Sequence, residues 1–195
     1  MTVEESDVRL ATRLATEAGD MLLTLQKNGD LEGQALGMEG DRIANAFLCR
    51  SLRESRPDDA VLSEEEKDSA ARLSARRVWI VDPLDGTREY GEGRSDWAVH
   101  VALAIDGVAT VGAVALPGLG TTLSSGSPPA LSPANKPPRM VVSRTRPAAE
   151  AVKVASMIGA ELVPMGSAGA KAMAEVRGEA DIYLHTGGQY EWDNC

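Results

Sequence analysis

The chain is organised around the stretch Arg77-Val78-Trp79-Ile80-Val81-Asp82-Pro83-Leu84-Asp85-Gly86-Thr87. Its first part, residues 78–81, is a short β-branched and aromatic run that predicts a strand. The strand delivers two carboxylates, Asp82 and Asp85, into a turn that contains a proline and a glycine. A hydroxyl follows at Thr87. Hard oxygen ligands and a hydroxyl at the end of a strand suit a divalent cation that carries a phosphate.

Simpler interpretations of this stretch stay open beside the metal site. Asp-Pro and Asp-Gly are ordinary turn dipeptides, and carboxylates often follow strands. A calcium-binding loop is excluded, because that loop needs a glutamate at its twelfth position. Gly93 stands at that position when Asp82 is counted as the first.

The composition is that of an ordinary globular protein, with 43% hydrophobic and 25% charged residues among 195. No apolar run is long enough to span a bilayer, and no signal peptide opens the chain. The two cysteines, Cys49 and Cys195, predict no disulfide framework and fit a reducing cytoplasm. The net charge of −9 argues against a nucleic acid polymer as partner. It would also repel a phosphate ester, so a protein of this charge that handles phosphates should do so through bound cations.

Periodicity predicts helices at residues 8–26, 41–55, 147–158 and 167–177. Strands are expected at residues 60–63, 78–81, 97–105, 108–116, 140–143, 162–165 and 181–185. Asp106-Gly107 predicts a hairpin between the third and fourth of these strands. Residues 31–40 and 118–138 are rich in glycine, serine or proline and are expected to be irregular. The second of these segments separates an N-terminal α+β metal-binding subdomain (1–138) from a C-terminal α/β subdomain (139–195).

Some acidic and aromatic residues allow two interpretations. Asp41 stands near the start of a predicted helix, where it would serve as an N-cap or first-turn acid. The run Glu64-Glu65-Glu66-Lys67-Asp68 would normally be a solvated face, yet it follows a strand, so one glutamate could reach the aspartate turn. Five of the seven aromatic residues lie in or near the two acidic loops, either as core or as the wall of a cleft that stacks a ring. They are Trp79, Tyr90, Trp97, Tyr190 and Trp192.

Four segments together resemble the inositol monophosphatase-like superfamily of magnesium-dependent, lithium-sensitive phosphatases. In chain order they are Ser63-Glu64-Glu65, Asp82-Pro83-Leu84-Asp85-Gly86-Thr87, Gly166-Ser167-Ala168-Gly169-Ala170-Lys171 and Trp192-Asp193. The amino-acid sequence of residues 78–90, followed by Asp96-Trp97-Ala98-Val99-His100, is most similar to that of the bacterial CysQ branch. Members of that branch remove the 3′-phosphate from 3′-phosphoadenosine 5′-phosphate, a by-product of sulfate assimilation. The resemblance covers essentially the whole chain and implies an α+β fold with a layered α/β/α/β/α sugar-phosphatase-like architecture.

The resemblance also implies residue roles. Two or three Mg²⁺ ions would be held by Glu64, Asp82, the carbonyl of Leu84, Asp85 and Asp193. Asp85, Gly86 and Thr87 would hold the phosphate, and the catalytic pair would be Thr87 with Asp41 hydrogen-bonded to it. A metal-activated water would attack phosphorus in line with the ester bond. Substrate contacts are assigned to Ser143, Lys171 and His185, which could equally be a strand-end cap, a helix-surface lysine and a polar edge residue.

The expected enzyme is therefore a 3′(2′),5′-bisphosphate nucleotidase acting on a small phosphorylated molecule, with no membrane partner. Alternatives are an inositol-1-monophosphatase, a fructose-1,6-bisphosphatase, or a non-catalytic metal- or nucleotide-binding protein of the same fold. The sequence leaves open whether the chain forms a homodimer. Members of the superfamily continue past the Trp-Asp motif with a further strand and helix, whereas this chain stops two residues after Asp193. We therefore expect a form truncated at the C-terminus, in which Asp193 would lie on a frayed end.

Overall fold

The computed structural model describes residues 5–195. Its strands are β1 (Ala60–Ser63), β2 (Arg77–Asp85), β3 (Ala98–Ile105), β4 (Val108–Leu116), β5 (Thr121–Ser124), β6 (Arg139–Ser143), β7 (Glu161–Met165) and β8 (Ile182–Tyr183). Its α-helices are α1 (Asp7–Asn28), α2 (Gly33–Ser55), α3 (Thr87–Gly91), α4 (Ala149–Ile158), α5 (Ala168–Val176) and α6 (Glu191–Asn194). Short 3-10 turns occur at Ala70–Ser74 and Pro117–Leu119. Within these residues, no helix combines the length and apolar character that crossing a membrane requires.

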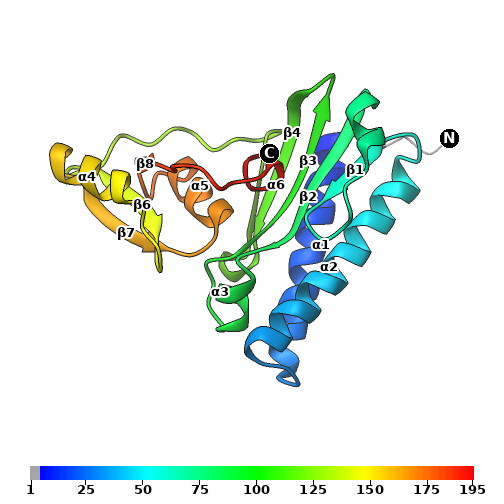
Figure 1. Cartoon of the computed structure of the whole chain (residues 1–195), viewed down its shortest axis with the longest axis horizontal. Helices are drawn as coiled ribbons and strands as arrows, with labels where there is room; N and C mark the ends of the chain where they lie inside the picture. Colours follow the sequence, from blue (N-terminus) through cyan, green and yellow to red (C-terminus); the bar gives the residue numbers. More distant parts are fainter. Residues whose placement is uncertain (1–4) are drawn as a thin grey trace.

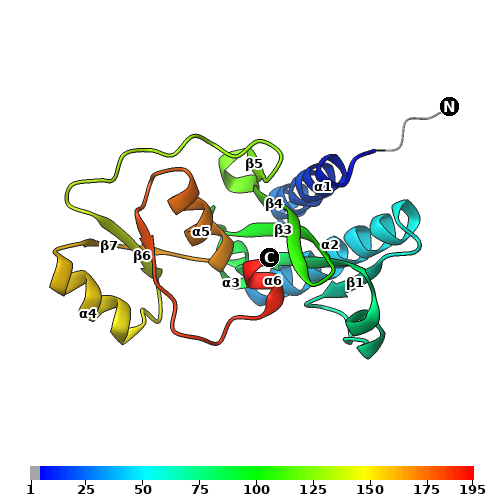
Figure 2. The same ribbon diagram turned by 90° about the horizontal axis from the view of Figure 1, so that it is seen from above.

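The elements form layers, as the resemblance implied (Figure 1). Helices α1 and α2 cover one face of a five-stranded sheet with the order β1-β2-β3-β4-β5. Helix α5 lies against the other face and separates this sheet from a second one, β7-β6-β8. Helix α4 packs on the outer side of the second sheet (Figure 2). The order α/β/α/β/α confirms the predicted architecture.

Alternation along the strands explains the layers. Buried residues at every second position of β2, β3 and β4 point toward α1 and α2, where they join the main core. The intervening positions of β3 and β4 pack against α5 through a smaller cluster that contains Ala98, Val114 and Leu116. The chain enters and leaves the hairpin through Asp106 and Gly107, both with positive φ (51° and 76°), which confirms the predicted turn. The predicted boundary at residue 138 lies in the segment without helix or strand between β5 and β6.

Helix α2 begins eight residues earlier than the sequence predicted, so the expected irregular segment at 31–40 is wrong. Its glycines are the reason, since glycine lowers helix propensity by about 1 kcal/mol. Here they allow close packing: a Cβ on Gly37 would lie 2.6 Å from Thr87 Cγ2, and one on Gly40 would lie 2.8 Å from Tyr90 Cε1. Helix α3 therefore fits directly against α2. Tertiary contact outweighs the local preference. As a consequence, Asp41 lies inside α2, and the capping interpretation for this residue is wrong.

Other local expectations also changed. Residues 87–91 form the one-turn helix α3, for which no helix was predicted, and the expected long loop at 118–138 contains strand β5. Strand β2 continues through Pro83 to Asp85. Trp79, Tyr90 and Trp97 are fully buried in the core, with the rings of the last two in edge contact at 5.0 Å, so the cleft-wall interpretation is wrong for these three.

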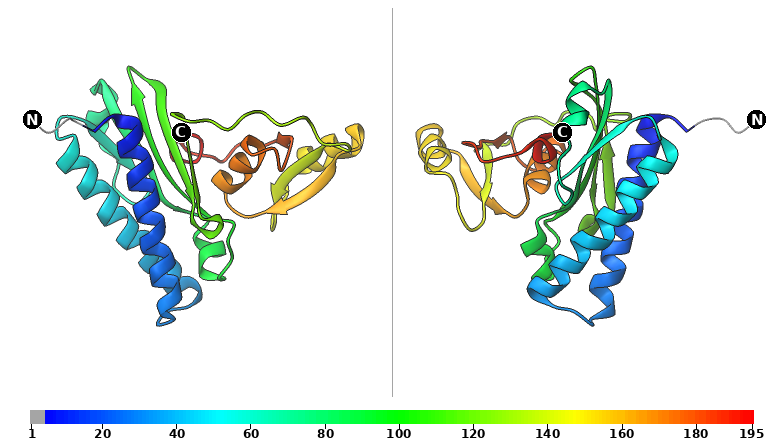
Figure 3. Two further views of the ribbon diagram at one scale, coloured as in Figure 1. Left: turned by 180° about the vertical axis from the view of Figure 1, so that it is seen from behind. Right: turned by 45° about the vertical axis from the view of Figure 1, so that its right-hand side comes forward.

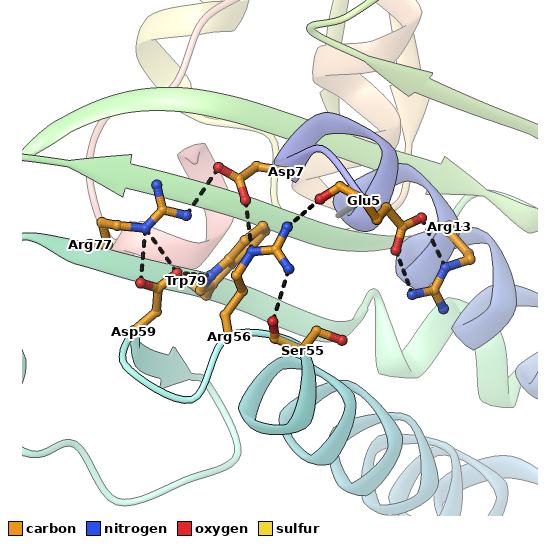
Figure 4. Close-up of polar contacts among 8 residues, drawn as sticks. All are labelled: Glu5, Asp7, Arg13, Ser55, Arg56, Asp59, Arg77 and Trp79. Carbon is orange, nitrogen blue, oxygen red and sulfur yellow. Dashed lines mark hydrogen bonds and ion pairs between the residues drawn. The ribbon is translucent and has the colours of Figure 1, made fainter. Parts of the chain in front are cut away.

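A polar network fastens the start of α1 to the end of α2 and to β2 (Figure 4). The guanidinium groups of Arg56 and Arg77 each lie 3.0 Å from a different oxygen of Asp7. Arg77 also donates to Asp59 at 2.8 Å, and the other Asp59 oxygen accepts from the Trp79 indole at 2.8 Å. These partly buried, charge-assisted bonds are stronger than exposed ion pairs. They hold the helix layer in register with the strand that leads to the acidic turn.

Candidate metal and phosphate site

A bulge at the end of β2 sets the direction of both aspartates. In an uninterrupted strand, the side chains of residues 82 and 85 would point to opposite faces. Here Asp82 lies opposite His100 and Asp85 opposite Ala98, so three steps on β2 match two on β3. The extra residue falls beside Pro83, whose missing N–H is tolerated at a bulge. Both carboxylates therefore lie on the sheet face that α5 covers.

Three carboxylates converge at this point. One oxygen from each of Asp82, Asp85 and Asp193 lies within 4.8 Å of the others. Asp193 comes from α6, whose backbone returns from the second sheet to pack beside β2 (Figure 3). Asp82 and Asp85 are 2% and 8% exposed, and an isolated buried carboxylate is costly. The structure thus brings together three acids that are up to 111 residues apart in the sequence.

Glu64 reaches the same region through strand pairing. Strand β1 runs parallel to β2, with Ser63 opposite Val81, so the next residue on each strand is Glu64 and Asp82. The Glu64 amide donates to the Val81 carbonyl at 3.3 Å and continues the ladder by one bond. Ser63 is buried, and its hydroxyl donates to Asn45 on α2 at 2.8 Å, which fixes the strand end. Glu64 is not one of the three acids in the tight cluster, although its charge acts on them.

Burial and mutual repulsion raise the pKa of two neighbouring acids, Asp82 and Glu64. Burial raises the pKa of Asp82 well above its usual value, and the charges of Asp85 and Glu64 raise it further. Burial also raises the pKa of Glu64, with added repulsion from Glu65 and Asp193. A site that accumulates carboxylates at this cost is suited to a cation, which replaces the missing positive charge.

Asp85 differs from its neighbours because it is surrounded by donors. Its two oxygens accept the backbone N–H groups of Ala168 and Gly169, at 3.2 and 2.5 Å, in the first turn of α5. The imidazole Nε2 of His100 lies 3.3 Å from Asp85 Oδ2. Burial alone would raise the pKa of Asp85, but His100 and the Gly169 amide lower it below the usual value. A carboxylate offers about four lone-pair positions, so Asp85 retains capacity for a metal.

Asp41 and Thr87 meet beside the acid cluster. The Thr87 hydroxyl lies 3.2 Å from Asp41 Oδ2 and 3.2 Å from the Leu84 carbonyl oxygen, and it can donate its single proton to one of them. Asp41 Oδ1 is buried and has no hydrogen-bond partner within the described chain. Burial, with repulsion from Glu65, raises the pKa of Asp41 to about 7. An orphaned buried oxygen of this kind is a place for a water molecule or a cation.

The turn between β2 and α3 depends on Gly86. Its φ of 91° belongs to the left-handed region, and a Cβ would lie 2.9 Å from the Ser167 Cβ. Glycine is therefore required there by conformation and by packing against α5. It starts α3, so that Thr87 occupies the first helical position with its hydroxyl beside the acids.

A pocket of about 500 Å³ opens beside the cluster, between α5, the end of β6 and the segment after β8. Asp85 and Asp193 line it, and so do all three predicted substrate residues, Ser143, Lys171 and His185. Lys171 is buried, its ammonium group donating to the carbonyls of Gly166 and Ser167 and lying 5.5 Å from the centre of the Tyr183 ring. Burial lowers the pKa of Lys171. Asp41, Thr87, Glu64 and Asp82 do not line this pocket.

The sequence did not single out several residues of the site. Arg146, Tyr183 and Gln189 line the pocket, and His100 lies against Asp85. The signal for His100 was present, since it is a polar residue in the middle of the buried run Ala98-Val99-His100-Val101-Ala102. Arg146 and Gln189 lie in segments without regular structure, where no periodicity indicates direction. The other two aromatic residues, Tyr190 and Trp192, stack on each other, with their ring centroids 4.9 Å apart.

The donor set fits a hard divalent cation. It consists of carboxylate oxygens, with the Leu84 carbonyl nearby, and such oxygens are the ligands that Mg²⁺, Mn²⁺ and Ca²⁺ prefer. Neither cysteine belongs to the cluster, and the three converging acids leave a repulsion that a cation would remove.

Comparison with known proteins agrees with this geometry. The chain is 48% identical to a 3′-phosphoadenosine 5′-phosphate phosphatase of Mycobacterium leprae, over 98% of this chain and 76% of that protein. It is 27% identical to the 3′(2′),5′-bisphosphate nucleotidase CysQ of Escherichia coli, over 94% of this chain and 82% of that protein. Its fold matches the crystal structure of CysQ from Bacteroides thetaiotaomicron, a bacterial member of the inositol monophosphatase family. That match has a TM-score of 0.80 at 23% identity and covers 96% of this chain and 82% of the other.

A family model described as "Inositol monophosphatase family" matches residues 3–195. The match spans both sheets and every acid of the cluster. Together with the layered fold and the convergence of Asp82, Asp85 and Asp193, it shows that the chain belongs to the inositol monophosphatase family of phosphatases.

Proposed function

We propose that this chain is a Mg²⁺-dependent phosphomonoesterase that removes the 3′-phosphate of 3′-phosphoadenosine 5′-phosphate. The observation that carries the proposal is a pocket with opposite charges on its walls. Asp85 and Asp193, which share the acid cluster with Asp82, line one part of it. The cationic side chains of Arg146 and Lys171 line another. Such a pocket suits a ligand with one phosphate for the metals and a second anionic group for the cations.

The metal ligands in this proposal are Glu64, Asp82, the Leu84 carbonyl, Asp85 and Asp193. Bound there, Mg²⁺ would supply a nucleophilic water at neutral pH and neutralise charge on the phosphate oxygens. In the chain itself, the bulge in β2 directs two of these acids to one side, and α6 brings the third. The acids therefore set where the phosphate lands.

Thr87 and Asp41 would orient the attacking water. The Thr87 hydroxyl can donate to Asp41 Oδ2 and still accept from a water through a lone pair. Asp41 Oδ1, buried without a partner among residues 5–195, would be a further acceptor for a water at this point. The Asp41 carboxylate would take the proton that this water gives up. The backbone amides at Gly86 and Thr87 start a helix, so they lack intrahelical acceptors and suit a phosphate oxygen.

The choice of nucleotide over inositol phosphate rests on the second anionic group. Arg146 is exposed, and no ion pair with another described residue accompanies it, so its charge is available to a ligand. The mycobacterial and E. coli relatives carry names that specify bisphosphorylated nucleotides. A bisphosphate would reach both ends of the pocket, whereas inositol monophosphate would use only the metal end. Mg²⁺ as the metal and a cytoplasmic location are further parts of this proposal.

The test is release of inorganic phosphate from a panel of substrates, with and without Mg²⁺. We expect 3′-phosphoadenosine 5′-phosphate to have the highest kcat/KM. Inositol 1-phosphate and fructose 1,6-bisphosphate are the competing substrates, and an equal or higher value for either would contradict the nucleotide assignment. No turnover of any of the three, with metal bound, would favour the non-catalytic alternative.

One variant sharpens the assignment. Arg146→Gln should raise KM for the bisphosphate about tenfold or more, because a charge-assisted contact is lost, and leave KM for inositol 1-phosphate unchanged. Arg50→Gln removes the same charge from the exposed face of α2 and is the matched control. Equal effects of the two changes would remove the role of Arg146.

A further inference from the structure

His100 is an unusual residue for its position. It is 2% exposed in the middle of β3, on the sheet face that α5 covers, between the buried alanines Ala98 and Ala102. Its two ring nitrogens face two different elements. Nδ1 lies 2.9 Å from the Trp192 carbonyl oxygen on α6, and Nε2 lies 3.3 Å from Asp85 Oδ2 at the end of β2. The side chain therefore joins elements that supply two members of the acid cluster.

The first turn of α5 also closes on this ring. The Gly169 amide donates to Asp85 Oδ2 at 2.5 Å, and a Cβ on Gly169 would overlap His100 Nε2. Asp85, His100 and Gly169 thus pack at one point, with no room for a larger residue at position 169. The ring cannot turn away without opening this contact.

The bond to α6 fixes the state of one nitrogen. A carbonyl oxygen only accepts hydrogen bonds, so Nδ1 must carry the proton that it donates to Trp192. Trp192 directly precedes Asp193, the acid that α6 contributes. An Asp193 oxygen accepts the N–H of Tyr190, the residue at the N-cap of α6, at 2.7 Å, which ties the carboxylate to its own short helix. Where the helix lies then decides where the Asp193 carboxylate lies.

Few other polar contacts hold α6. Within residues 5–195, His100 makes the one buried hydrogen bond that joins α6 to another helix or strand. The contact from Arg72 to Glu191 is exposed and long, at 3.4 Å. A four-residue helix has little stability of its own. Its position depends on contacts of this kind.

We infer that His100 is a positioning residue for the acid cluster: its Nδ1–H holds α6 at the Trp192 carbonyl, so that Asp193 reaches Asp82 and Asp85. The inference rests on the metal site of the proposed function and not on the identity of the substrate. Groups that orient metal ligands in this way typically change metal affinity by 10- to 100-fold when they are removed.

The test compares two variants of His100, each of which keeps a nitrogen at only one of the two imidazole positions. Asparagine places its amide nitrogen near the position of Nδ1, and glutamine places it near that of Nε2. His100→Asn should therefore bind Mn²⁺, a substitute for Mg²⁺ suited to calorimetry, within about threefold of the original protein. His100→Gln should bind it about tenfold more weakly or worse. Thermal unfolding in EDTA should give equal midpoints for the two variants, which separates positioning from stability.

Any other order of affinities overturns the inference, including equal loss in both variants or greater loss in His100→Asn. The measurement contains no substrate, so an error in the proposed substrate leaves it unchanged and appears only as a failure of turnover. A chain that binds no Mn²⁺ at all would contradict the metal site and this role of His100 together.

A second measurement needs no variant. The sequence has two histidines, His100 and His185, so ¹⁵N-histidine labelling gives a spectrum with two imidazoles. We expect one imidazole to keep a protonated Nδ1 across the neutral pH range, in slow exchange with water because it is buried. An unprotonated Nδ1 in both rings at neutral pH would overturn the inference, even if His100→Gln does not fold.

Discussion

The Thr87 hydroxyl lies 3.2 Å from Asp41 Oδ2, across a sequence separation of 46 residues. The contact joins the first residue of α3 to the interior of α2 at the edge of the acid cluster. It exists because three features coincide: Gly86 starts α3, Gly37 lets α3 approach, and α2 extends far enough to present Asp41. The predictions below test this pair and the acids beside it.

The hydroxyl of Thr87 should be essential for turnover while its methyl group should not. Thr87→Val keeps the shape and should lower kcat by about 10²- to 10⁴-fold, because the water loses its orienting group. Thr87→Ser keeps the hydroxyl and should stay within about tenfold of the original rate. Phosphate release under saturating Mg²⁺ measures both. Similar rates in the two variants would show that the hydroxyl has no part in the chemistry.

Gly37→Ala should destabilise the protein although alanine is the better helix former. Helix propensity favours the change by about 1 kcal/mol. The new Cβ would lie 2.6 Å from Thr87 Cγ2 and 3.1 Å from the Thr87 carbonyl oxygen, and such overpacking costs about 1–3 kcal/mol.

A double-mutant cycle tests this contact. Urea unfolding gives the free energies of unfolding of Gly37→Ala, Thr87→Ser and the double variant. Serine removes the contacted methyl, so the double variant should recover at least about 0.5 kcal/mol relative to additivity. Strict additivity would mean that α3 does not press against α2 at this point.

Addition of Mg²⁺ to the EDTA-treated protein should raise its thermal midpoint. A ligand at about 100 times its dissociation constant adds about 2.7 kcal/mol to the free energy of unfolding. Asp193→Asn should reduce this shift strongly, since it removes one of the three converging carboxylates. Asp30→Asn makes the same charge change at an exposed site in the turn between α1 and α2 and should leave the shift intact. A shift of equal size in both variants would place the metal elsewhere.

Without metal, Asp41 should make the protein less stable as the pH rises. Burial and neighbouring acids raise its pKa from 3.8 to about 7 in the folded chain. The folded state therefore binds this proton more tightly than the unfolded state, and the contribution of Asp41 to the free energy of unfolding falls between about pH 4 and about pH 7. Below this range both states are protonated, and above it both are ionised, so the contribution is constant at each end.

Asp41→Asn should flatten the pH dependence of stability in that interval. At about 1.4 kcal/mol per pKa unit, the difference amounts to a few kcal/mol. Urea unfolding in EDTA at about pH 5 and about pH 7.5 measures it for both proteins. An equally steep fall in the variant would assign the pH dependence to the other acids of the cluster.

Local patterns in the sequence predicted seven of the eight strands of the described chain, the hairpin and most of its helices, and missed β5. Alternation marks β3 and β4, Asp106-Gly107 marks their turn, and helical spacing marks α1, α4 and α5. The acidic segment at the end of β2 was also evident, because aspartates beside proline and glycine at a strand end form a local signal. The resemblance of four segments to a phosphatase superfamily supplied the fold class, which the layers of the structure confirm.

Only the tertiary structure decided which side chains meet. The glycines of α2 discourage a helix when they are read alone, yet they are the points where α3 packs. The resemblance implied the bond between Asp41 and Thr87, and the packed helices show it. The bulge at Pro83 turns Asp82 and Asp85 to one face, and strand register is a property of the paired strands. Asp193 and His100 meet their partners through α6 and β3, elements far apart in the chain. Periodicity reports the environment along a segment, whereas a site depends on distances between segments, and these are fixed only when the layers close on one another.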